Sequence, residues 1–444
     1  MKTKIQLSDH FNYRRLLMFT YPSIVMLVVS SVYGVVDGFF VSNFVGKTAF
    51  TAVNLIYPVL IILGSAGFMF GTGGGALIAK TMGEGKRELA DRQFSLIVYV
   101  SVGCGVILSA LGILLIRPMA VMLGATGQLL EDSVVYARII LLAIPAYILQ
   151  YEFQCLFATA GKPSLGLLVT VLAGVTNMAL DGLFVAVLQW GLEGAAAATA
   201  LSQVVGGVVP LIYFAGKNSS LLKLGKTSFD KQVLGKTCMN GSSELLSNIS
   251  MSVVSILYNF QLLRFAGEDG VAAYGVLMYV SLIFQAVFIG YAVGSAPVVS
   301  YHYGAGNREE LHSLLKKSLI LIGIFSFLMF GAALVLASPL SKIFVGYDRE
   351  LYLLTVRAFG LFSFSFLFSG FAILGSSFFT ALNDGPVSAA ISFLRTMVFQ
   401  VAAVIIFPMF WKVDGIWISI AAAELLAMFA ALAFLKVKRK KYHY

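Results

Sequence analysis

Apolar runs long enough to cross a lipid bilayer recur along the whole length of this sequence. A membrane-spanning helix needs about 20 consecutive, mostly apolar residues. The chain is 59% hydrophobic and only 12% charged, which excludes an ordinary soluble domain. We expect twelve membrane-spanning helices, approximately at residues 16–44, 50–79, 93–116, 133–158, 163–189, 193–215, 237–263, 272–301, 316–337, 353–380, 386–410 and 415–435.

The two halves of the chain resemble each other when one is displaced along the other until Gly83 lies on Gly304. We call this displacement the repeat shift. It aligns segment 83–88 with 304–309, which both follow a Gly-x-Gly-x-Arg-Glu pattern, and it aligns Trp190 with Trp411. Because each half contains an even number of spans, both halves enter the membrane in the same direction. The repeats are therefore parallel.

These patterns predict an all-α integral membrane protein. We expect two parallel six-helix repeats that form two pseudo-symmetric lobes around a central cavity. The N-lobe would comprise residues 1–215 and the C-lobe residues 237–444, which end in a basic tail. A polar connector at 216–236 carries five lysines and is expected to be a cytoplasmic linker between the lobes.

The positive charges of the chain concentrate on one side of the expected membrane. Most of the 31 Lys and Arg residues fall in the N-terminal segment, in every second connection and in the C-terminal tail. This distribution follows the positive-inside rule and predicts a cytoplasmic membrane protein with both termini in the cytoplasm. The net charge of +10 therefore indicates membrane topology rather than a nucleic-acid partner. The first fifteen residues or so are polar, so we expect no cleaved signal peptide.

Several polar residues fall inside the apolar spans, where charged groups are costly and are functional candidates by default. Tyr33 and Asp37 lie four residues apart in the first span, so they share one helix face. Asn177 and Asp181 repeat this spacing in the fifth span, and Thr199 adds a hydroxyl in the sixth. Two carboxylates, an amide, a phenol and a hydroxyl around one cavity would bind a proton or a hard monovalent cation.

Under the repeat shift these acids have no counterparts in the second half. Asp37 aligns with Tyr258, and the fifth-span pair Asn177 and Asp181 aligns with Val398 and Ala402. We therefore expect the second lobe to form a less polar pocket. The alternative for the first lobe is that Asp37 and Asp181 lie near the outer ends of their spans and contact water there.

Further polar residues inside the spans are secondary candidates. Glu244 lies near the start of the seventh expected span, where it either caps the helix or lines the cavity. Gln203 follows Thr199 by one helical turn. Arg395 and Glu424 are both internal, and an ion pair between them is the structural alternative to a role in transport. Glu152 and Gln154 in the fourth span would either line the cavity or lie at the cytoplasmic boundary.

The chain resembles the multidrug and toxic compound extrusion (MATE) transporters over essentially its full length. The resemblance is carried by the two six-span halves, segment 36–41, the turn at 160–163, the Asn-x-x-x-Asp pattern of the fifth span and the paired glycine loops. It is greatest to the DinF branch, whose N-lobe cation site uses an Asp, an Asn, an Asp and a Thr. The resemblance assigns these roles to Asp37, Asn177, Asp181 and Thr199, with Tyr33 as a neighbour.

The resemblance also places a bend of the first span at Pro22. Other branches of the family pair a glutamate of span seven, here Glu244, with an aspartate of span ten. The tenth span of this chain contains no acid between 359 and 379, so the C-lobe site departs from that pattern.

The expected function is a secondary exporter coupled to H⁺ or Na⁺. It would exchange the ion for organic, mostly cationic amphiphilic compounds by alternating access, as a monomer among membrane lipids and without a resident cofactor. One alternative is a flippase for lipid-linked sugars on a related two-lobe scaffold, whose cavity would be strongly basic. A second alternative is an integral-membrane enzyme that acts on a lipid. The sequence contains no catalytic triad, zinc-ligand spacing or nucleotide motif, so we expect neither catalysis nor a metal site.

Overall fold

The structure is a computed structural model that describes residues 5–444. Inside this range the burial and side-chain contacts of six residues are outside the description, namely Val35, Gly38, Phe39, Ser42, Asn43 and Lys47. Every regular element in residues 5–444 is helical. In a bilayer this is expected, because a helix satisfies its backbone hydrogen bonds within the segment itself.

The first half of the chain forms seven helices. They are α1 (Tyr13–Phe40), α2 (Lys47–Gly83), α3 (Arg87–Met122), α4 (Gly127–Leu142), α5 (Ile144–Thr159), α6 (Pro163–Asp181) and α7 (Gly191–Ala215). Short π-helical segments extend α1 through Val41–Val45 and α6 through Gly182–Val187. The α4 and α5 helices make up one span that bends by 59° at Ala143.

The second half forms six helices, two of which contain a sharp break. They are α8 (Lys231–Gly304), α9 (Arg308–Val345), α10 (Arg349–Ser363), α11 (Phe366–Ala381), α12 (Gly385–Phe393) and α13 (Gln400–Tyr442). A π-helical segment joins α12 to α13, and the α10–α11 pair bends by 47°. Gly267 interrupts α8 with φ 63°, and Lys412 interrupts α13 with φ 49°, so each of these long helices crosses the membrane twice.

The number of spans follows from these breaks. Eight helices are long and apolar enough to cross a membrane, the two bent pairs add two more, and the breaks in α8 and α13 add another two. The structure therefore has twelve spans within residues 5–444, at the positions expected from the sequence. The all-α, twelve-span prediction is confirmed.

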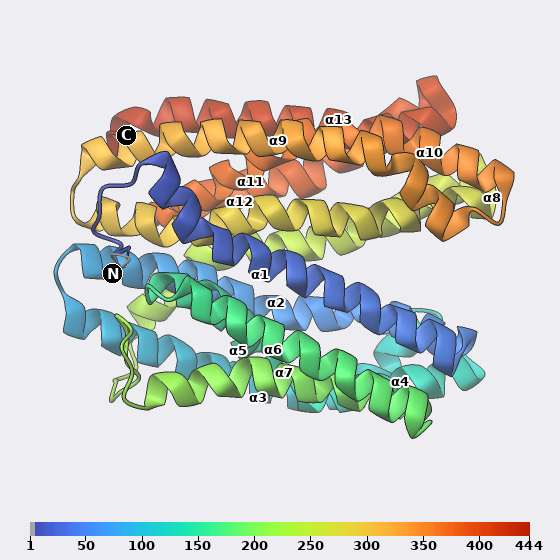
Figure 1. Ribbon diagram of the computed structural model, residues 1–444, viewed down its shortest axis with the longest axis horizontal. Coiled ribbons are helices and arrows are strands. Elements are labelled where there is room, and N and C mark those ends of the chain that lie inside the picture. The colour runs from blue at the N-terminus through green and yellow to red at the C-terminus, as the bar shows by residue number, and fades with distance from the viewer. Residues whose placement is uncertain (1–4) are drawn as a thin grey trace.

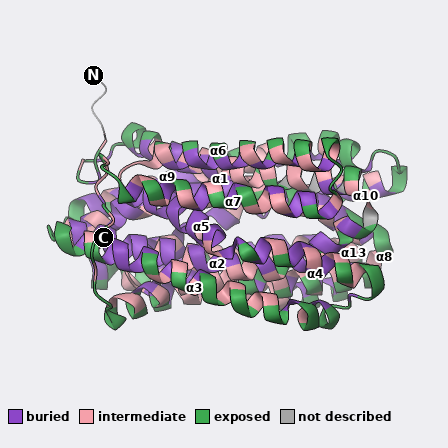
Figure 2. Cartoon of the chain, turned by 90° about the horizontal axis from the view of Figure 1, so that it is seen from below, coloured by how far each residue is buried: buried purple, intermediate pink, exposed green. Residues whose placement is uncertain are grey.

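The two halves form two bundles that lie side by side, and we call them the N-lobe and the C-lobe. Figure 1 shows α1–α7 in the N-lobe and α8–α13 in the C-lobe, with α1 along the boundary. The buried residues lie on the inner faces of the helices, and exposed residues gather at the turns (Figure 2). The α2 and α8 helices form the most extensive contact between the lobes, and α1 packs against both α8 and α6.

Glycines allow the two lobes to approach closely. A methyl group at Gly73 would come within 2.2 Å of the carbonyl oxygen of Thr237 on α8. A methyl at Gly83 would come within 2.0 Å of the Tyr301 carbonyl, and one at Gly304 within 2.0 Å of the Lys80 carbonyl. Since real side-chain carbons do not approach so closely, these positions hold the helix backbones in direct contact.

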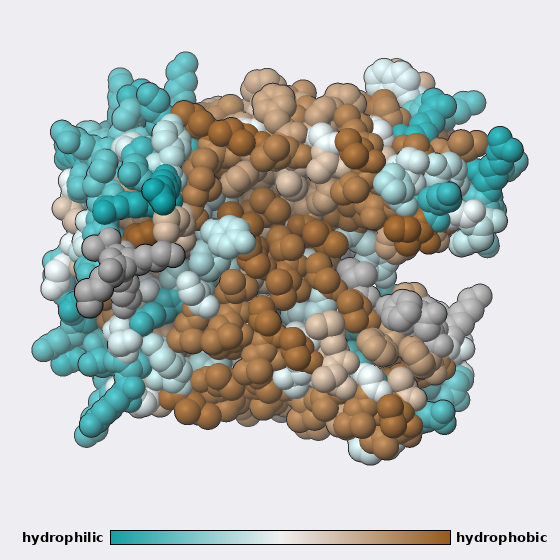
Figure 3. All heavy atoms as spheres, in the orientation of Figure 1, coloured by the Kyte–Doolittle hydropathy of each residue, from teal (hydrophilic) through white to brown (hydrophobic). Residues whose placement is uncertain are grey.

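The molecule has two hydrophilic ends separated by a hydrophobic belt, as Figure 3 shows. Both chain termini lie at one end (Figure 1), which we call the terminal end. The opposite end, which we call the far end, contains the turns before α2 and α4 and the break at Gly267. At the far end the lobes separate and leave a cleft between them (Figure 3).

The polar connector between the lobes runs along α3. The Lys223 amide donates to Asp91 at 3.0 Å, and the Gly225 amide donates to Ser95 at 2.9 Å. Asp230 then caps α8 by accepting hydrogen bonds from two amides of its first turn. Consequently α8 begins at Lys231, and the last part of the expected linker, 231–236, is already helical.

Candidate functional site

Three helices of the N-lobe bring a carboxylate, a hydroxyl and an amide together. Asp37 projects from the last turns of α1, and the hydroxyl of Thr199 on α7 donates to its Oδ1 at 3.1 Å. The Nδ2 of Asn177 on α6 donates to the Thr199 hydroxyl at 3.5 Å. Asp37 and Thr199 are 162 positions apart in the chain, so only the bundle fold places them in one network.

Asp181 is the second acid of this network and lies one helical turn after Asn177. Its side chain is 0% exposed, and neither carboxylate oxygen accepts a hydrogen bond from an N–H or hydroxyl donor among the described residues. The carboxyl groups of Asp181 and Asp37 are close enough for their charges to interact. An ionised carboxylate without a partner costs several kcal/mol in a low-dielectric interior. Two such groups in one pocket therefore favour a bound proton or cation.

Tyr33 lies one turn before Asp37 and belongs to the same pocket. Its hydroxyl accepts a hydrogen bond from Gln150 of α5 at 3.2 Å and one from Ser30 at 3.4 Å. The ring packs against α6, where a methyl at Gly174 would come within 3.0 Å of it. All five main candidates thus converge inside the N-lobe. Asp181 is fully buried, which argues against contact with water for this acid, whereas Asp37 is partly exposed.

Two tyrosines of the pocket were missed from the sequence. Tyr136 of α4 is 3% exposed, and its hydroxyl lies within hydrogen-bonding reach of Thr199 and close to both aspartates. Tyr57 of α2 lies near Tyr33 and Asp37. Nothing in the sequence around Tyr136 or Tyr57 distinguishes these tyrosines from lipid-facing ones. Their positions depend on how α2 and α4 pack against α1.

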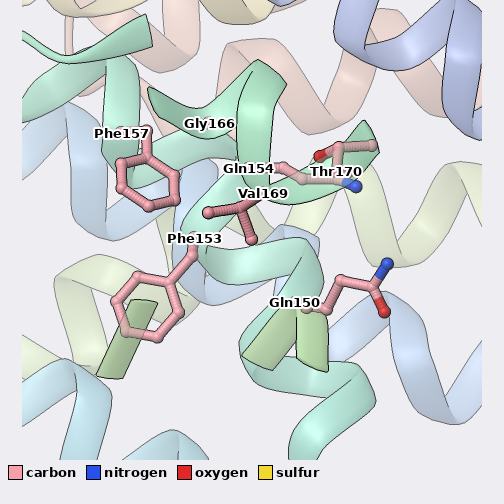
Figure 4. A pocket seen from close by; sticks show the side chains of 8 residues that line it. Gln150, Phe153, Gln154, Phe157, Gly166, Val169 and Thr170 are labelled. Atoms are coloured by element: carbon pink, nitrogen blue, oxygen red, sulfur yellow. The ribbon is translucent and has the colours of Figure 1, made fainter. Parts of the chain in front are cut away.

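Polar side chains continue from this network into α5. Gln150 and Gln154 line a small pocket with Thr170 of α6 and Gly206 of α7, beside two phenylalanine rings (Figure 4). Both polar atoms of the Gln154 amide are buried without a partner within residues 5–444. Gln154 therefore lies in the interior of the N-lobe.

Glu152 of α5 is also buried inside the N-lobe. Its side chain is 0% exposed, and it forms a hydrogen bond with Ser101 of α3. Glu152 therefore lies between α3 and α5, about two turns before the end of α5 at Thr159.

The secondary candidates Gln203 and Glu244 differ in their surroundings. Gln203 is 6% exposed, and its Oε1 has no hydrogen-bond partner in the described part of the chain. Glu244 lies several turns inside α8, whose cap is Asp230, so a capping role for Glu244 is wrong. It is half-buried, its charge interacts with that of Arg395, and it lies close to the thiol of Cys155 in the opposite lobe. Glu244 therefore faces the region between the lobes.

Arg395 forms a buried ion pair within the C-lobe. Its Nε donates to both carboxylate oxygens of Glu424, at 3.1 and 2.8 Å, and the two side chains are 14% and 3% exposed. Gln285 accepts a further, weaker hydrogen bond at 3.5 Å. The structural ion pair that the sequence allowed is therefore present. The positive charge of Arg395 is therefore paired with Glu424 within the C-lobe.

Pro22 lies inside the first helix. The α1 helix runs from Tyr13 to Phe40 across this proline without interruption. The bend expected at Pro22 therefore stays a prediction.

The less polar C-lobe pocket was expected at Tyr258, Val398 and Ala402. Tyr258 is buried, and its hydroxyl shares a hydrogen bond with that of Ser419 at 2.9 Å. Val398 is 40% exposed and Ala402 is also exposed, so these two residues do not line a pocket.

The register of the two repeats explains this error. Pro163 is the first residue of α6, whereas α12 begins at Gly385. The turns before these helices have a positive φ at Gly161 and Asn383, which are separated by one position more than the repeat shift. Counted from these turns, Asp181 corresponds to Ala403, which is 4% exposed. The helical segments that follow these turns differ in length between the two repeats. The repeat shift applies again only at the next turn, where Gly191 aligns with Lys412.

Comparison with known protein families decides the identity of the chain. The MatE family model matches residues 22–183 and again residues 245–406. The chain belongs to the MatE family. This MatE protein is therefore a multi-pass membrane transporter and not an enzyme. The family model matches the chain twice, which agrees with the two repeats.

Individual MatE relatives are similar along the whole chain. The multidrug export protein MepA of Staphylococcus haemolyticus is 22% identical over 423 residues, which cover 95% of this chain and 92% of the relative. A solved multidrug resistance MATE family transporter in an outward-facing conformation matches with a TM-score of 0.93 at 22% identity, over 100% of this chain and 99% of that chain. A MATE crystal structure in the straight conformation matches with a TM-score of 0.93 at 21% identity, with the same coverage. At this identity the solved structures show the fold.

Proposed function

We propose that this chain is a cation-coupled multidrug antiporter. It exchanges H⁺ or Na⁺ for organic, mostly cationic amphiphilic compounds by alternating access, and it acts as a monomer that requires no resident cofactor. The observation that carries this proposal is the N-lobe network of Asp37, Thr199, Asn177 and Asp181, in which a fully buried acid has no hydrogen-bond donor among the described residues. The DinF-like branch remains our assignment within the family.

The chemistry of the pocket favours a small cation as the coupling ion. Carboxylate, amide and hydroxyl oxygens are the ligands that hard cations prefer, and the same carboxylates accept protons. Asp37 and Asp181 repel each other when both are ionised, so binding of one positive charge relieves both the repulsion and the cost of burial. Asp37, Asn177, Asp181 and Thr199 would hold the ion, with Tyr33 beside them.

The charges between the lobes favour a cationic cargo. Glu244 faces this region without a salt bridge to any described residue, whereas Arg395 is neutralised by Glu424. A flippase for lipid-linked sugars would instead need unpaired basic groups. Aromatic side chains such as Tyr151, which stacks on Phe68 with ring centroids 4.3 Å apart, suit flat amphiphilic compounds. The name of the relative from S. haemolyticus, a multidrug export protein, agrees with this class.

The orientation of the transporter follows from its charges and its cleft. Basic residues concentrate at the terminal end, where the positive-inside rule predicts the cytoplasm. With both termini in the cytoplasm, the cleft at the far end opens to the outside (Figure 3). The described conformation would then be the one that releases cargo and takes up the coupling ion in the cytoplasmic membrane.

Coupling requires that the ion and the cargo influence each other's affinity. Entry of an ion from outside neutralises Asp37 and Asp181, which weakens the attraction of the pocket for a cationic compound. By thermodynamic linkage, the bound compound lowers the affinity for the ion by the same factor. The exchange is then driven by the gradient of whichever ion the pocket binds.

The test is drug transport into inverted membrane vesicles with H⁺ and Na⁺ gradients imposed separately. We expect Asp37→Asn to abolish ion-driven transport, because one of the two charges that the ion neutralises is gone. Asp181→Asn should reduce transport more than Glu244→Gln does, since the N-lobe pocket holds the ion. The matched control is Asp132→Asn, which changes an acid at the far end of the molecule, in α4, and should transport normally.

Two results would contradict this proposal at equal protein levels. Normal ion-driven transport by Asp37→Asn would remove the N-lobe site from the mechanism. A stronger defect in Glu244→Gln than in Asp181→Asn would move the coupling site to the C-lobe.

A further inference from the structure

A buried acid lies at the terminal end, far from the N-lobe pocket. Glu310 belongs to the first turn of α9 in the C-lobe, and its side chain is only 5% exposed. One carboxylate oxygen accepts a hydrogen bond from the backbone amide of Phe11 at 2.9 Å. The other lies 2.5 Å from Nδ1 of His10. Both partners precede α1, about 300 residues earlier in the chain, so Glu310 binds the N-terminal segment to the C-lobe.

A second side chain of α9 binds the same segment. Lys317 lies two turns after Glu310 and donates to the carbonyl oxygen of Phe11. The backbone amide and carbonyl of Phe11 are therefore both held by α9. The side chains of Leu7 and Phe11 are 1% and 0% exposed, and the Phe11 ring meets the edge of His302 on α8. We call residues 5–12 the N-terminal strap.

The strap connects the two lobes through α1. Its last residue leads directly into Tyr13, the first residue of α1. The early turns of α1 pack on α8, where a methyl at Gly294 would come within 3.1 Å of Thr20. The late turns of the same helix carry Asp37 into the N-lobe pocket. Movement of the lobes apart at the terminal end would therefore pull on the strap.

The geometry points to Glu310 as a positioning residue for transport, which holds the N-terminal strap on the C-lobe and keeps the terminal end closed while the far end is open. This inference rests on the proposed alternating access. Opening of the terminal end requires the strap to leave α9, and this movement exposes Leu7 and Phe11. Removal of the Glu310 carboxylate eliminates its contacts with His10 and with the Phe11 amide. The state with a closed terminal end therefore loses stability relative to the state with an open terminal end.

The experiment measures the distance between the lobes at the terminal end. Spin labels are attached at Glu88 of α3 and His312 of α9, which are both exposed, after replacement of Cys104, Cys155 and Cys238 by serine. The full chain is studied in lipid nanodiscs by pulsed electron double resonance. We expect Glu310→Ala to increase the ratio of long to short distances on the order of tenfold, because hydrogen bonds to a charged group are among the stronger ones.

Two variants control for loss of folding and for charge. Glu309→Ala removes the neighbouring exposed acid, whose side chain makes no hydrogen bond to the described residues, and should leave the distances unchanged. Glu310→Gln can still accept from the Phe11 amide but has no charge, so it should produce an intermediate increase. A folding defect would change the thermal stability of Glu310→Ala without this graded order.

The inference is overturned if Glu310→Ala and Glu310→Gln show the distances of the parent chain. It is also overturned if Glu309→Ala changes them as much as Glu310→Ala does. The distances are measured without an ion gradient or drug. An unchanged distance in Glu310→Ala would therefore leave the transport test of Asp37 and Asp181 unaffected. A failure of that transport test would likewise leave the distances interpretable as a property of the two lobes.

Discussion

The buried ion pair of the C-lobe allows a quantitative prediction. Glu424→Gln replaces a carboxylate that accepts two hydrogen bonds from Arg395 by a neutral amide of nearly the same size. Arg395 would then donate only to neutral amide oxygens, that of the new glutamine and that of Gln285 at 3.5 Å. The substitution thus removes the paired counter-charge of Arg395 in an apolar interior, while the volume of the side chain stays nearly the same.

The size of the effect follows from the burial of the pair. The two side chains are 14% and 3% exposed, so solvent screens the charge of Arg395 poorly. Loss of one partner from a buried pair destabilises a protein by about 3–5 kcal/mol. At roughly 2 °C per kcal/mol for a large chain, we expect the melting temperature to fall by at least about 5 °C. Replacement of both residues, as in Arg395→Met with Glu424→Leu, should recover most of this loss, because no charge remains buried.

The assay is thermal unfolding of the purified protein in detergent, followed by intrinsic fluorescence at one fixed scan rate. The matched control is Glu131→Gln, which breaks the pair between Arg117 and Glu131. Both of those side chains are 52% exposed, and exposed pairs contribute about 0–1 kcal/mol. A shift for Glu424→Gln no larger than that of the control would refute our assignment of Arg395 as a buried, compensated charge.

Three further predictions test other parts of the structure. Gly73→Ala should raise the fraction of long distances between spin labels at Glu88 and His312, because its methyl would come within 2.2 Å of the Thr237 carbonyl. Gly103→Ala is the control and should leave the distances unchanged, since open space surrounds Gly103. Thr199→Val should weaken ion-driven transport by removing the donor to Asp37, and Thr199→Ser should restore it. Burial acts to raise the pKa of Asp384, but the hydrogen bond from Tyr442 and the charge of Lys441 more than offset it and hold this pKa below its usual value of about 3.9. The stabilising contribution of the Asp384 carboxylate is therefore fully present above about pH 4 and is lost as the pH falls through the lowered pKa. Asp384→Asn should accordingly expose the tail around Tyr442 to limited proteolysis at neutral pH, while the parent chain resists; equal cleavage of both would contradict this.

The spans and the repeat could be predicted because each leaves a local signal in the sequence. Apolar length marks a span, and the glycine patterns recur where the backbone requires a positive φ. Gly85 and Gly306 have φ values of 80° and 69° at equivalent positions of the two repeats. At Gly191 and Lys412, also equivalent, φ is 61° and 49°, although the second residue is not glycine. A turn can thus persist in a repeat after its glycine has been replaced.

The register within a repeat could not be predicted from one shift. One residue more separates Pro163, the first residue of α6, from Gly191 than separates Gly385, the first residue of α12, from Lys412. A single shift therefore matches the ends of these helices but misaligns their middles, and it assigned Val398 and Ala402 to a pocket. Helix length is set by the packing at both ends of the helix. A repeat pattern in the sequence does not predict that packing.

The pocket was predictable only where its residues share a helix face. The spacing of four residues indicated that Asn177 and Asp181 point the same way, and membrane depth indicated that they avoid lipid. No such signal exists for Tyr136, because its neighbours across the pocket belong to other helices. For Glu244, position along the apolar run suggested a helix end, whereas the actual start of α8 is determined by the polar cap at Asp230.

The paired glycine contacts at the terminal end have a consequence for how the lobes move. Gly83 meets the Tyr301 carbonyl and Gly304 meets the Lys80 carbonyl, and the repeat shift converts each of these pairs into the other. The contact is therefore isologous, like the interface of a two-fold symmetric homodimer. A contact with this symmetry forms and separates in the same way for both lobes, so it favours neither of them. Any directionality in the cycle must then originate in the pocket chemistry, where Asp37 and Asp181 occur in one half alone.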